Sequence, residues 1–143
     1  MKKECIFCKI INKKNKQKED IIYEDKKTIA LLDISPASKK GGHTLVIPKK
    51  HYELVTEMPD EDLKAIMFTI RKISKALMSF ALGMNIIQNN KKVAGQYIKH
   101  VHFHLVPRFP KDGITIEKWT TFRYKDELHR QEIASKIKNL LKE

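Results

Sequence analysis

Cysteine, arginine and long apolar runs are all scarce in this chain of 143 residues. With only two cysteines, the chain lacks the disulfide framework that stabilises many small secreted domains. No run reaches the roughly 18 apolar residues that a bilayer-spanning helix needs, and the first lysines are not followed by the apolar stretch of a secretory signal. These absences favour a cytoplasmic protein with no membrane partner, of a size that fits one domain with its own core.

The charge of the chain is strongly positive, at a formal +12, but most of the positive charge is lysine. Only four residues are arginine, whose planar guanidinium is best suited to bidentate contacts with phosphates and bases. The lysines are scattered in short pairs and do not form one stripe. We therefore expect no specific nucleic-acid binding, although the excess charge would steer an anionic substrate towards the protein.

The two cysteines form the motif Cys5-x-x-Cys8. In a reducing compartment such a pair indicates a metal or redox site before a structural disulfide. The βαβ pattern expected around a thioredoxin-like redox motif is missing here, which favours metal binding. Because a structural zinc site normally has four nitrogen or sulfur ligands, two further ligands are needed.

The apolar pattern predicts an α+β fold with an antiparallel sheet. A short helical turn is expected over 5–12, a polar loop over 12–20, and strands over 21–24, 28–34, 43–47, 84–88 and 99–106. A long helix is expected to begin with Asp60 as its N-cap and to stop by Gly83, and a second amphipathic helix to cover 126–141. The strands come as neighbouring pairs and do not alternate with helices, which is typical of an antiparallel sheet.

The densest chemical signal is the sequence His100-Val101-His102-Phe103-His104. Successive side chains of a β-strand point to opposite faces, so the three histidines would share one face and the apolar residues the other. Next-but-one residues of a strand lie roughly 6–7 Å apart, which would bring all three imidazoles close to one small ligand.

Three neighbouring imidazoles allow two kinds of chemistry. A neutral imidazole can be a nucleophile when a hydrogen bond to its other nitrogen fixes the tautomer, while its neighbours donate to an anion or protonate a leaving group. The rival is a metal site made by the three histidines. The amides and glycine just upstream suit a phosphate pocket; they are Asn89, Asn90, Gly95 and Gln96.

Several blocks together resemble the histidine triad (HIT) family. In the order found in that family, they are 5–11 (CIFCKII), 32–36 (LDISP), 42–51 (GHTLVIPKKH), 89–90 (NN), 94–96 (AGQ) and 100–107 (HVHFHLVP). The match runs from about residue 4 to residue 109 and is most similar to the bacterial HIT hydrolases related to the adenosine phosphoramidase (Hint) group. The resemblance implies one HIT domain over 1–143, with a five-stranded antiparallel sheet, a long central helix and a C-terminal extension over 110–143.

The resemblance also implies a nucleotide hydrolase whose nucleophile is the middle histidine, His102. In the family this residue attacks the α-phosphorus of a purine nucleoside phosphoramidate or related nucleotidyl conjugate, and water then hydrolyses the nucleotidyl-histidine to a nucleoside monophosphate. The backbone carbonyl of His100 would orient the nucleophile. The positions of His104, His43 and Gln96 match those that contact the phosphate or the leaving group.

A nucleotide pocket is implied at further matched positions. Asp33 would accept hydrogen bonds from the ribose hydroxyls, and Asn89 would lie near the phosphate. The purine base would pack against an apolar wall made by Ile6, Phe7, Ile10 and Ile34. Tyr97 departs from the pattern, because many relatives have serine or threonine there; we leave it out of the catalytic set.

Zinc-containing HIT relatives imply the ligands Cys5, Cys8, His51 and His100. Such a zinc would be structural, since closed coordination leaves no position for an activated water, and we expect no organic cofactor. It would pin the N-terminal segment to the strand with the nucleophile. The family also implies a homodimer, and the long helix and Trp119 beyond the triad are candidates for a subunit contact or a lid.

Two other functions stay open on the sequence. One is a dinucleoside polyphosphate hydrolase resembling the Fhit branch; the other is a zinc-stabilised nucleotide-binding adaptor without significant turnover. A DNA-end module resembling aprataxin has no appended nucleic-acid motif to support it. Val101 disfavours the galactose-1-phosphate uridylyltransferase relatives, which carry proline between the first two histidines.

Overall fold

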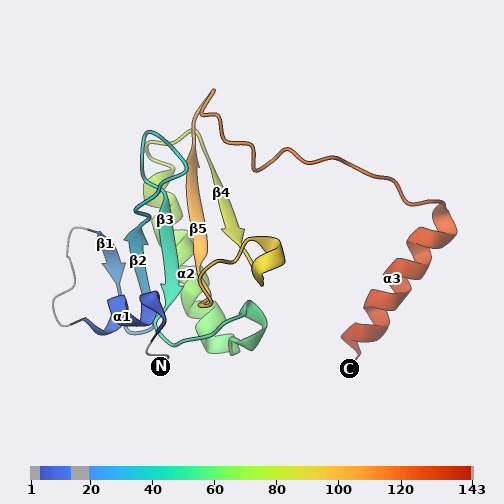
Figure 1. The fold of residues 1–143 in the computed structure, drawn as a ribbon, viewed down its shortest axis with the longest axis horizontal. Coiled ribbons are helices and arrows are strands. Elements are labelled where there is room, and N and C mark those ends of the chain that lie inside the picture. Colours follow the sequence, from blue (N-terminus) through green and yellow to red (C-terminus); the bar gives the residue numbers. More distant parts are fainter. Residues whose placement is uncertain (1–3, 14–19, 143) are drawn as a thin grey trace.

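The computed structural model describes residues 4–13 and 20–142, and their strands form one antiparallel sheet in the order β1-β2-β3-β5-β4 (Figure 1). The elements are α1 (Ile6–Asn12), β1 (Ile21–Glu24), β2 (Thr28–Leu32), β3 (Thr44–Pro48), α2 (Asp60–Leu77), β4 (Gly83–Gln88), β5 (Phe103–Arg108) and α3 (Glu127–Leu141), with short 3₁₀ turns at Val55–Glu57 and Lys92–Ala94. The expected α+β fold with a five-stranded antiparallel sheet is confirmed. Most of the loop expected over 12–20 lies outside the described residues.

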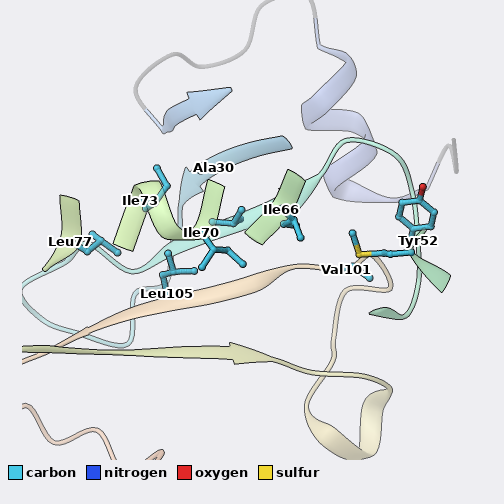
Figure 2. Close-up of a cluster of buried hydrophobic side chains, with 10 residues drawn as sticks. Ala30, Tyr52, Ile66, Ile70, Ile73, Leu77, Val101 and Leu105 are labelled. Atoms are coloured by element: carbon cyan, nitrogen blue, oxygen red, sulfur yellow. The ribbon is translucent and has the colours of Figure 1, made fainter. Parts of the chain in front are cut away.

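Helix α2 covers one face of the sheet and closes the main core. Its residues Ile66, Ile70 and Ile73 recur at helical spacing and are buried. They belong to the same apolar cluster as Ala30 of β2 and Leu105 of β5 (Figure 2). This face of the sheet is therefore filled by side chains.

The ends of α2 differ from the expectation. Pro59, not Asp60, is the N-cap: its backbone is extended and its carbonyl accepts the amide of Asp62. The helix ends at Leu77, well before Gly83, which instead begins β4. The chain turns directly after the helix, where the amides of Phe80 and Ala81 donate to the carbonyl of Leu77, and the amide of Leu82 then pairs with the carbonyl of Arg108 at the sheet edge. Helical spacing alone does not reveal such a distant partner.

Helix α1 lies against the opposite face of the sheet. Its residue Phe7 is buried with Ile29 and Leu31 of β2 and with Leu45 and Ile47 of β3. These strand residues alternate in sequence with those that face α2, as the two-residue period of a strand requires. The face under α1 is the one that carries the histidines, because Phe7 contacts their rings edge-on.

The histidine strand begins later than expected. We predicted it over 99–106, but β5 starts at Phe103, so His100 and His102 precede it. Pairing with β3 stops at Phe103, and the amide of Val101 donates instead to the carbonyl of Tyr52. The side chains before β5 still alternate between the two faces, because Val101 belongs to the core on the α2 side.

Two other strands shift by one or two residues. β2 ends at Leu32 rather than at 34, because the carboxylate of Asp33 accepts the amide of Ser35 and turns the chain. β3 runs to Pro48 and leaves out His43, whose imidazole accepts the amide of Ala37 in the preceding loop. Both departures place polar side chains at the end of the sheet.

Beyond β5 the chain leaves the sheet as an extended segment that leads to α3 (Figure 1). The expected helix over 126–141 is observed one residue shorter, with Asp126 as its N-cap accepting the amide of His129. None of the residues of α3 is buried, and Trp119 ahead of it is 74% exposed. No helix in the described ranges combines the length and apolar character that crossing a bilayer requires.

Candidate functional site

A cavity of about 420 Å³ lies between α1, the ends of β2 and β3, and the segment that carries the histidines. We call it the histidine cavity. Eight residues expected at a nucleotide site line it: Ile6, Phe7, Ile10, Asp33, Ile34, Asn89, His102 and His104. They come from four separate segments of the chain, so the fold brings together most of the residues that the sequence singled out.

One part of the histidine cavity is apolar and uncovered. Ile34 is 89% exposed and Ile6 is 53% exposed, although both are large aliphatic side chains. Phe7 and Leu45 complete this wall from the buried side. Exposed aliphatic groups gathered at a cavity indicate a ligand with an apolar face, and the nearby carboxylate of Asp33 can accept hydrogen bonds from hydroxyl groups.

His102 is oriented as a nucleophile would be. Its Nδ1 lies 2.7 Å from the carbonyl oxygen of His100, and since a carbonyl only accepts, Nδ1 carries the proton. Burial lowers the pKa of His102, which keeps the ring neutral at pH 7. The Nε2 lone pair is therefore available, and Phe7 packs against the ring at 5.2 Å between centroids.

A second chain of hydrogen bonds sets the tautomer of His104. The amide of Ala37 donates to Nδ1 of His43 at 3.0 Å, so the proton of the neutral His43 ring is on Nε2. That nitrogen lies 2.9 Å from Nδ1 of His104, which must then accept. His104 consequently holds its proton on Nε2 and can donate it to an anion. Burial lowers the pKa of His43, and lowers that of His104 to about 4.

His100 belongs to a different cluster from the other two triad histidines. Its Nδ1 lies 3.4 Å from Sγ of Cys5 and 3.2 Å from Nδ1 of His51, while Sγ of Cys8 lies 3.3 Å from the same His51 nitrogen. The four expected ligand atoms all lie within 4.8 Å of one another. Our expectation that three imidazoles would face one small ligand is thus wrong for His100.

The four-residue cluster fits zinc. Nitrogen and sulfur ligands at zinc bond lengths in a tetrahedron lie roughly 3.3–3.8 Å apart, close to the separations in this cluster. The Nε2 of His100 donates to the carbonyl of Pro48 at 2.8 Å, which leaves Nδ1 unprotonated towards the sulfurs. The rival site made of three histidines is not formed within the described part of the chain.

Gln96 is placed away from the histidine cavity. Its side chain is buried, accepts the amide of Lys91 at 2.7 Å and donates to the carbonyl of Glu53 at 2.6 Å. These bonds hold the loop that contains Asn89 and Gly95, both of which line the cavity. In this arrangement the amide of Gln96 shapes the cavity wall from behind.

Comparison with known proteins identifies the family of this chain. The model of the HIT domain matches residues 14–111. An uncharacterized HIT-like protein of Methanocaldococcus jannaschii is 47% identical over 114 residues, which are 79% of this chain and 85% of that protein. This chain belongs to the histidine triad family.

Other HIT relatives extend the likeness to nearly the whole chain. A protein of Schizosaccharomyces pombe named adenosine 5′-monophosphoramidase is 37% identical over 141 residues, covering 94% of this chain and 98% of that one. The crystal structure of a HIT family member from Bacillus subtilis superposes with a TM-score of 0.85 at 39% identity, covering 95% and 96% of the two chains. The expectation of a HIT-type hydrolase is confirmed.

Within this HIT fold, the sequence analysis named Gly95 for a phosphate pocket but did not assign five other residues that line the cavity: Leu31, Leu32, Leu45, Tyr97 and Ile98. Ile98 lines the cavity and has the same parity as the three histidines, so the two-residue period could have revealed it. Gly95 lies at the cavity with a φ of +91°, a conformation that favours glycine. Tyr97 also lines the cavity and is 86% exposed, a position that its residue type did not indicate.

Proposed function

We propose that this HIT hydrolase cleaves purine nucleoside phosphoramidates, or related nucleotidyl conjugates, at the α-phosphate through a covalent nucleotidyl-His102 intermediate. The observation that carries the proposal is the bond between Nδ1 of His102 and the carbonyl of His100. It leaves a buried, neutral imidazole at the cavity with one free lone pair, which is what nucleophilic attack on phosphorus requires.

The reaction proceeds in two displacements. Nε2 of His102 attacks the α-phosphorus, the bond from phosphorus to the leaving nitrogen breaks, and the leaving amine takes up a proton. The Nε2 proton of His104, held there by His43, donates to the phosphate oxygens or the departing group. Water then attacks the same phosphorus, releases the nucleoside monophosphate and returns His102 to its neutral form.

The remaining cavity residues would bind the nucleotide. The apolar wall formed by Ile6, Phe7, Ile10 and Ile34 suits a purine, and Asp33 suits the ribose hydroxyls. Asn89 would meet the phosphate. We propose that Gln96 contributes through the loop that it holds at Lys91.

The test is AMP release from adenosine 5′-phosphoramidate by the wild-type protein and by His102→Ala. We expect the variant to lose activity by a factor on the order of 10³ or more, because the nucleophile is removed, while AMP binding by calorimetry persists. His129→Ala on α3 is the matched control and should keep the wild-type rate. A His102→Ala variant with wild-type turnover would exclude the proposed nucleophile.

The same assay separates the alternative functions. Faster cleavage of a diadenosine polyphosphate than of AMP-lysine by the wild-type protein would favour a dinucleoside polyphosphate hydrolase. Tight AMP binding by a wild-type protein that cleaves neither substrate would favour the nucleotide-binding adaptor. The metal content and folding of each purified protein are measured in both assays, so that a loss of fold is not mistaken for a loss of chemistry.

We also propose that Cys5, Cys8, His51 and His100 hold one structural zinc ion. When bound, zinc would cross-link the N-terminal segment to the residue whose carbonyl orients His102. Metal analysis of protein purified without added zinc should find one zinc per chain; its absence would contradict this assignment. The homodimer and the cytoplasmic location stay predictions, and sedimentation of the purified protein tests the former.

A further inference from the structure

A second hollow, of about 460 Å³, lies apart from the histidine cavity. Its walls are Ser38, Lys39 and Lys40 from the loop between β2 and β3, and residues 109–113 from the segment after β5. None of these residues lines the histidine cavity. We call it the basic hollow, because three lysines line it: Lys39, Lys40 and Lys111.

The carboxylate in the wall of the basic hollow, Asp112, is already fully engaged. One of its oxygens accepts Nε of Arg108 at 2.8 Å and the amide of Phe109 at 3.0 Å. The other accepts Nη2 of Arg108 at 3.2 Å and the amide of Ile114 at 3.0 Å. Arg108 holds the pKa of Asp112 well below its usual range. The charge of Asp112 is thus compensated within its own turn and does not neutralise the lysines.

The three lysines have no carboxylate partner within the described ranges, where the ion pairs belong to other residues. The ammonium of Lys40 lies 4.6 Å from the centroid of the Phe109 ring, which holds it beside the hollow. Lys111 has a φ of +58°, a left-handed conformation unusual for lysine. Three ammonium groups without a carboxylate partner at one concave surface favour the binding of an anion there.

Ser38 adds a neutral donor to this site. The residue is only 1% exposed, and its hydroxyl oxygen accepts the amide of Lys40 at 3.3 Å. Its own hydrogen has no acceptor within the part of the chain that the structure describes. A hydroxyl hydrogen and several ammonium groups are donors that match the oxygens of a phosphate.

We propose that the basic hollow is a second anion site, which binds a phosphate-bearing ligand independently of the nucleotide in the histidine cavity. The charge on this surface would otherwise be uncompensated, whereas phosphate oxygens would engage the lysines and Ser38 together. The phosphate could belong to a small phosphorylated molecule or to the backbone of a nucleic acid. Both sources present the same chemistry, and the experiment distinguishes them.

The experiment is calorimetric titration of the full-length protein with inorganic tripolyphosphate, with the histidine cavity saturated by AMP. The test variant carries Lys39→Ala, Lys40→Ala and Lys111→Ala; the control carries Lys125→Ala, Lys136→Ala and Lys138→Ala, which remove the same charge from near or within α3. We expect the control to keep the wild-type affinity and the test variant to lose about tenfold or more. Thermal unfolding of both variants checks that they fold.

The outcomes separate the possible sources of phosphate. Tripolyphosphate binding that a short oligothymidylate does not displace identifies a small phosphorylated ligand, and displacement identifies a nucleic-acid backbone; both support the site. Equal losses in the two triple variants would overturn it, since only diffuse surface charge would then be acting. The absence of tripolyphosphate binding to the AMP-saturated protein would also overturn it. Phosphoramidate hydrolysis is measured separately, so failure here leaves the proposed function standing.

Discussion

The two faces of the sheet are built from the same strands, but one packs into the core under α2 and the other borders the histidine cavity. On the α2 face, Ala30, Val46 and Leu105 are completely buried and share one apolar cluster with the helix. On the α1 face, the next residues along the same strands border a cavity that leaves Ile34 almost fully exposed. Because neighbouring side chains of a strand point to opposite sides, alternate residues of the same strand pack in the core and face the cavity. Substitutions on the two faces should therefore separate stability from activity.

The largest expected effect is on the α2 face. Ile70→Ala removes a side chain that is 1% exposed and should lower the free energy of unfolding by about 3 kcal/mol, through lost burial and the cavity left behind. Urea denaturation measures this change. Ile137→Ala on the exposed surface of α3 is the control and should change it little. A changed KM of the folded Ile70→Ala protein would contradict the separation of the two faces.

The histidine face should make stability depend on pH. Burial lowers the pKa of His104 to about 4 in the folded protein, against about 6.5 in the unfolded chain. The unfolded chain thus binds a proton first, so stability is complete above pH 6.5 and is lost as the pH falls towards 4. We expect a loss of about 2 kcal/mol after allowing for solvent around the half-buried ring. Urea denaturation at pH 7 and at pH 4.5 measures it.

The variant His104→Gln provides the matched test of that pH dependence. Glutamine does not titrate, so its stability should fall less steeply between the same two pH values. Ile70→Ala, on the other face, should keep the wild-type slope at a lower overall stability. An unchanged slope in His104→Gln would assign the pH dependence to other groups.

A smaller effect is expected at the uncovered wall of the cavity. Ile34→Ala should leave the free energy of unfolding within about 0.5 kcal/mol, since the side chain is 89% exposed. It should weaken nucleotide binding by about 1 kcal/mol, or roughly fivefold in the dissociation constant for AMP, because an apolar contact is lost. Val93→Ala is the control, because Val93 is 98% exposed and does not line the cavity. Identical AMP affinities for the two variants would argue against a base-binding wall.

The smallest effect concerns strain in the loop beside the histidine cavity. Lys91 has φ +70° and ψ +158°, a backbone conformation adopted almost only by glycine. Lys91→Gly should therefore stabilise the protein by about 1 kcal/mol, with part of the relief offset by the freedom of glycine in the unfolded chain. Thermal unfolding should show a rise for Lys91→Gly and a fall for Lys92→Gly, its neighbour in the 3₁₀ turn. A fall in both would exclude strain at Lys91.

Strain and function coincide in this chain. The two non-glycine residues with positive φ in the described ranges are Lys91 and Lys111. The first holds the loop between Asn89 and Gly95 at the histidine cavity, and the second lines the basic hollow. The α2 face has no such residue among its core members. A strained backbone conformation persists where other interactions outweigh its energetic cost. Here the two strained residues lie beside the histidine cavity and the basic hollow.

The sequence predicted the elements more reliably than their ends. Strong periodicity placed the five strands and three helices, since it reflects a local rule that each segment obeys by itself. The ends of β2, α2 and β5 were wrong by up to several residues. They depend on partners elsewhere, such as the carbonyl of Tyr52 for Val101 and that of Arg108 for Leu82. Eight of the residues lining the histidine cavity were foreseen because the HIT resemblance is carried by short, ordered motifs.

The fold class, the alternation that puts the histidines on one face, and the chemical groups available there all follow from local patterns in the sequence. The division of those groups between the cysteine–histidine cluster and the histidine cavity depends on contacts between distant segments. Cys5 lies 95 residues away from His100 in sequence, yet its sulfur lies 3.4 Å from Nδ1 of that imidazole, whereas His102 and His104 line the histidine cavity. Tautomers were decided in the same way, by the carbonyl of His100 and the amide of Ala37. The side-chain period is a property of the local backbone, whereas the partner of a buried polar group depends on which distant segments the fold brings within hydrogen-bond distance.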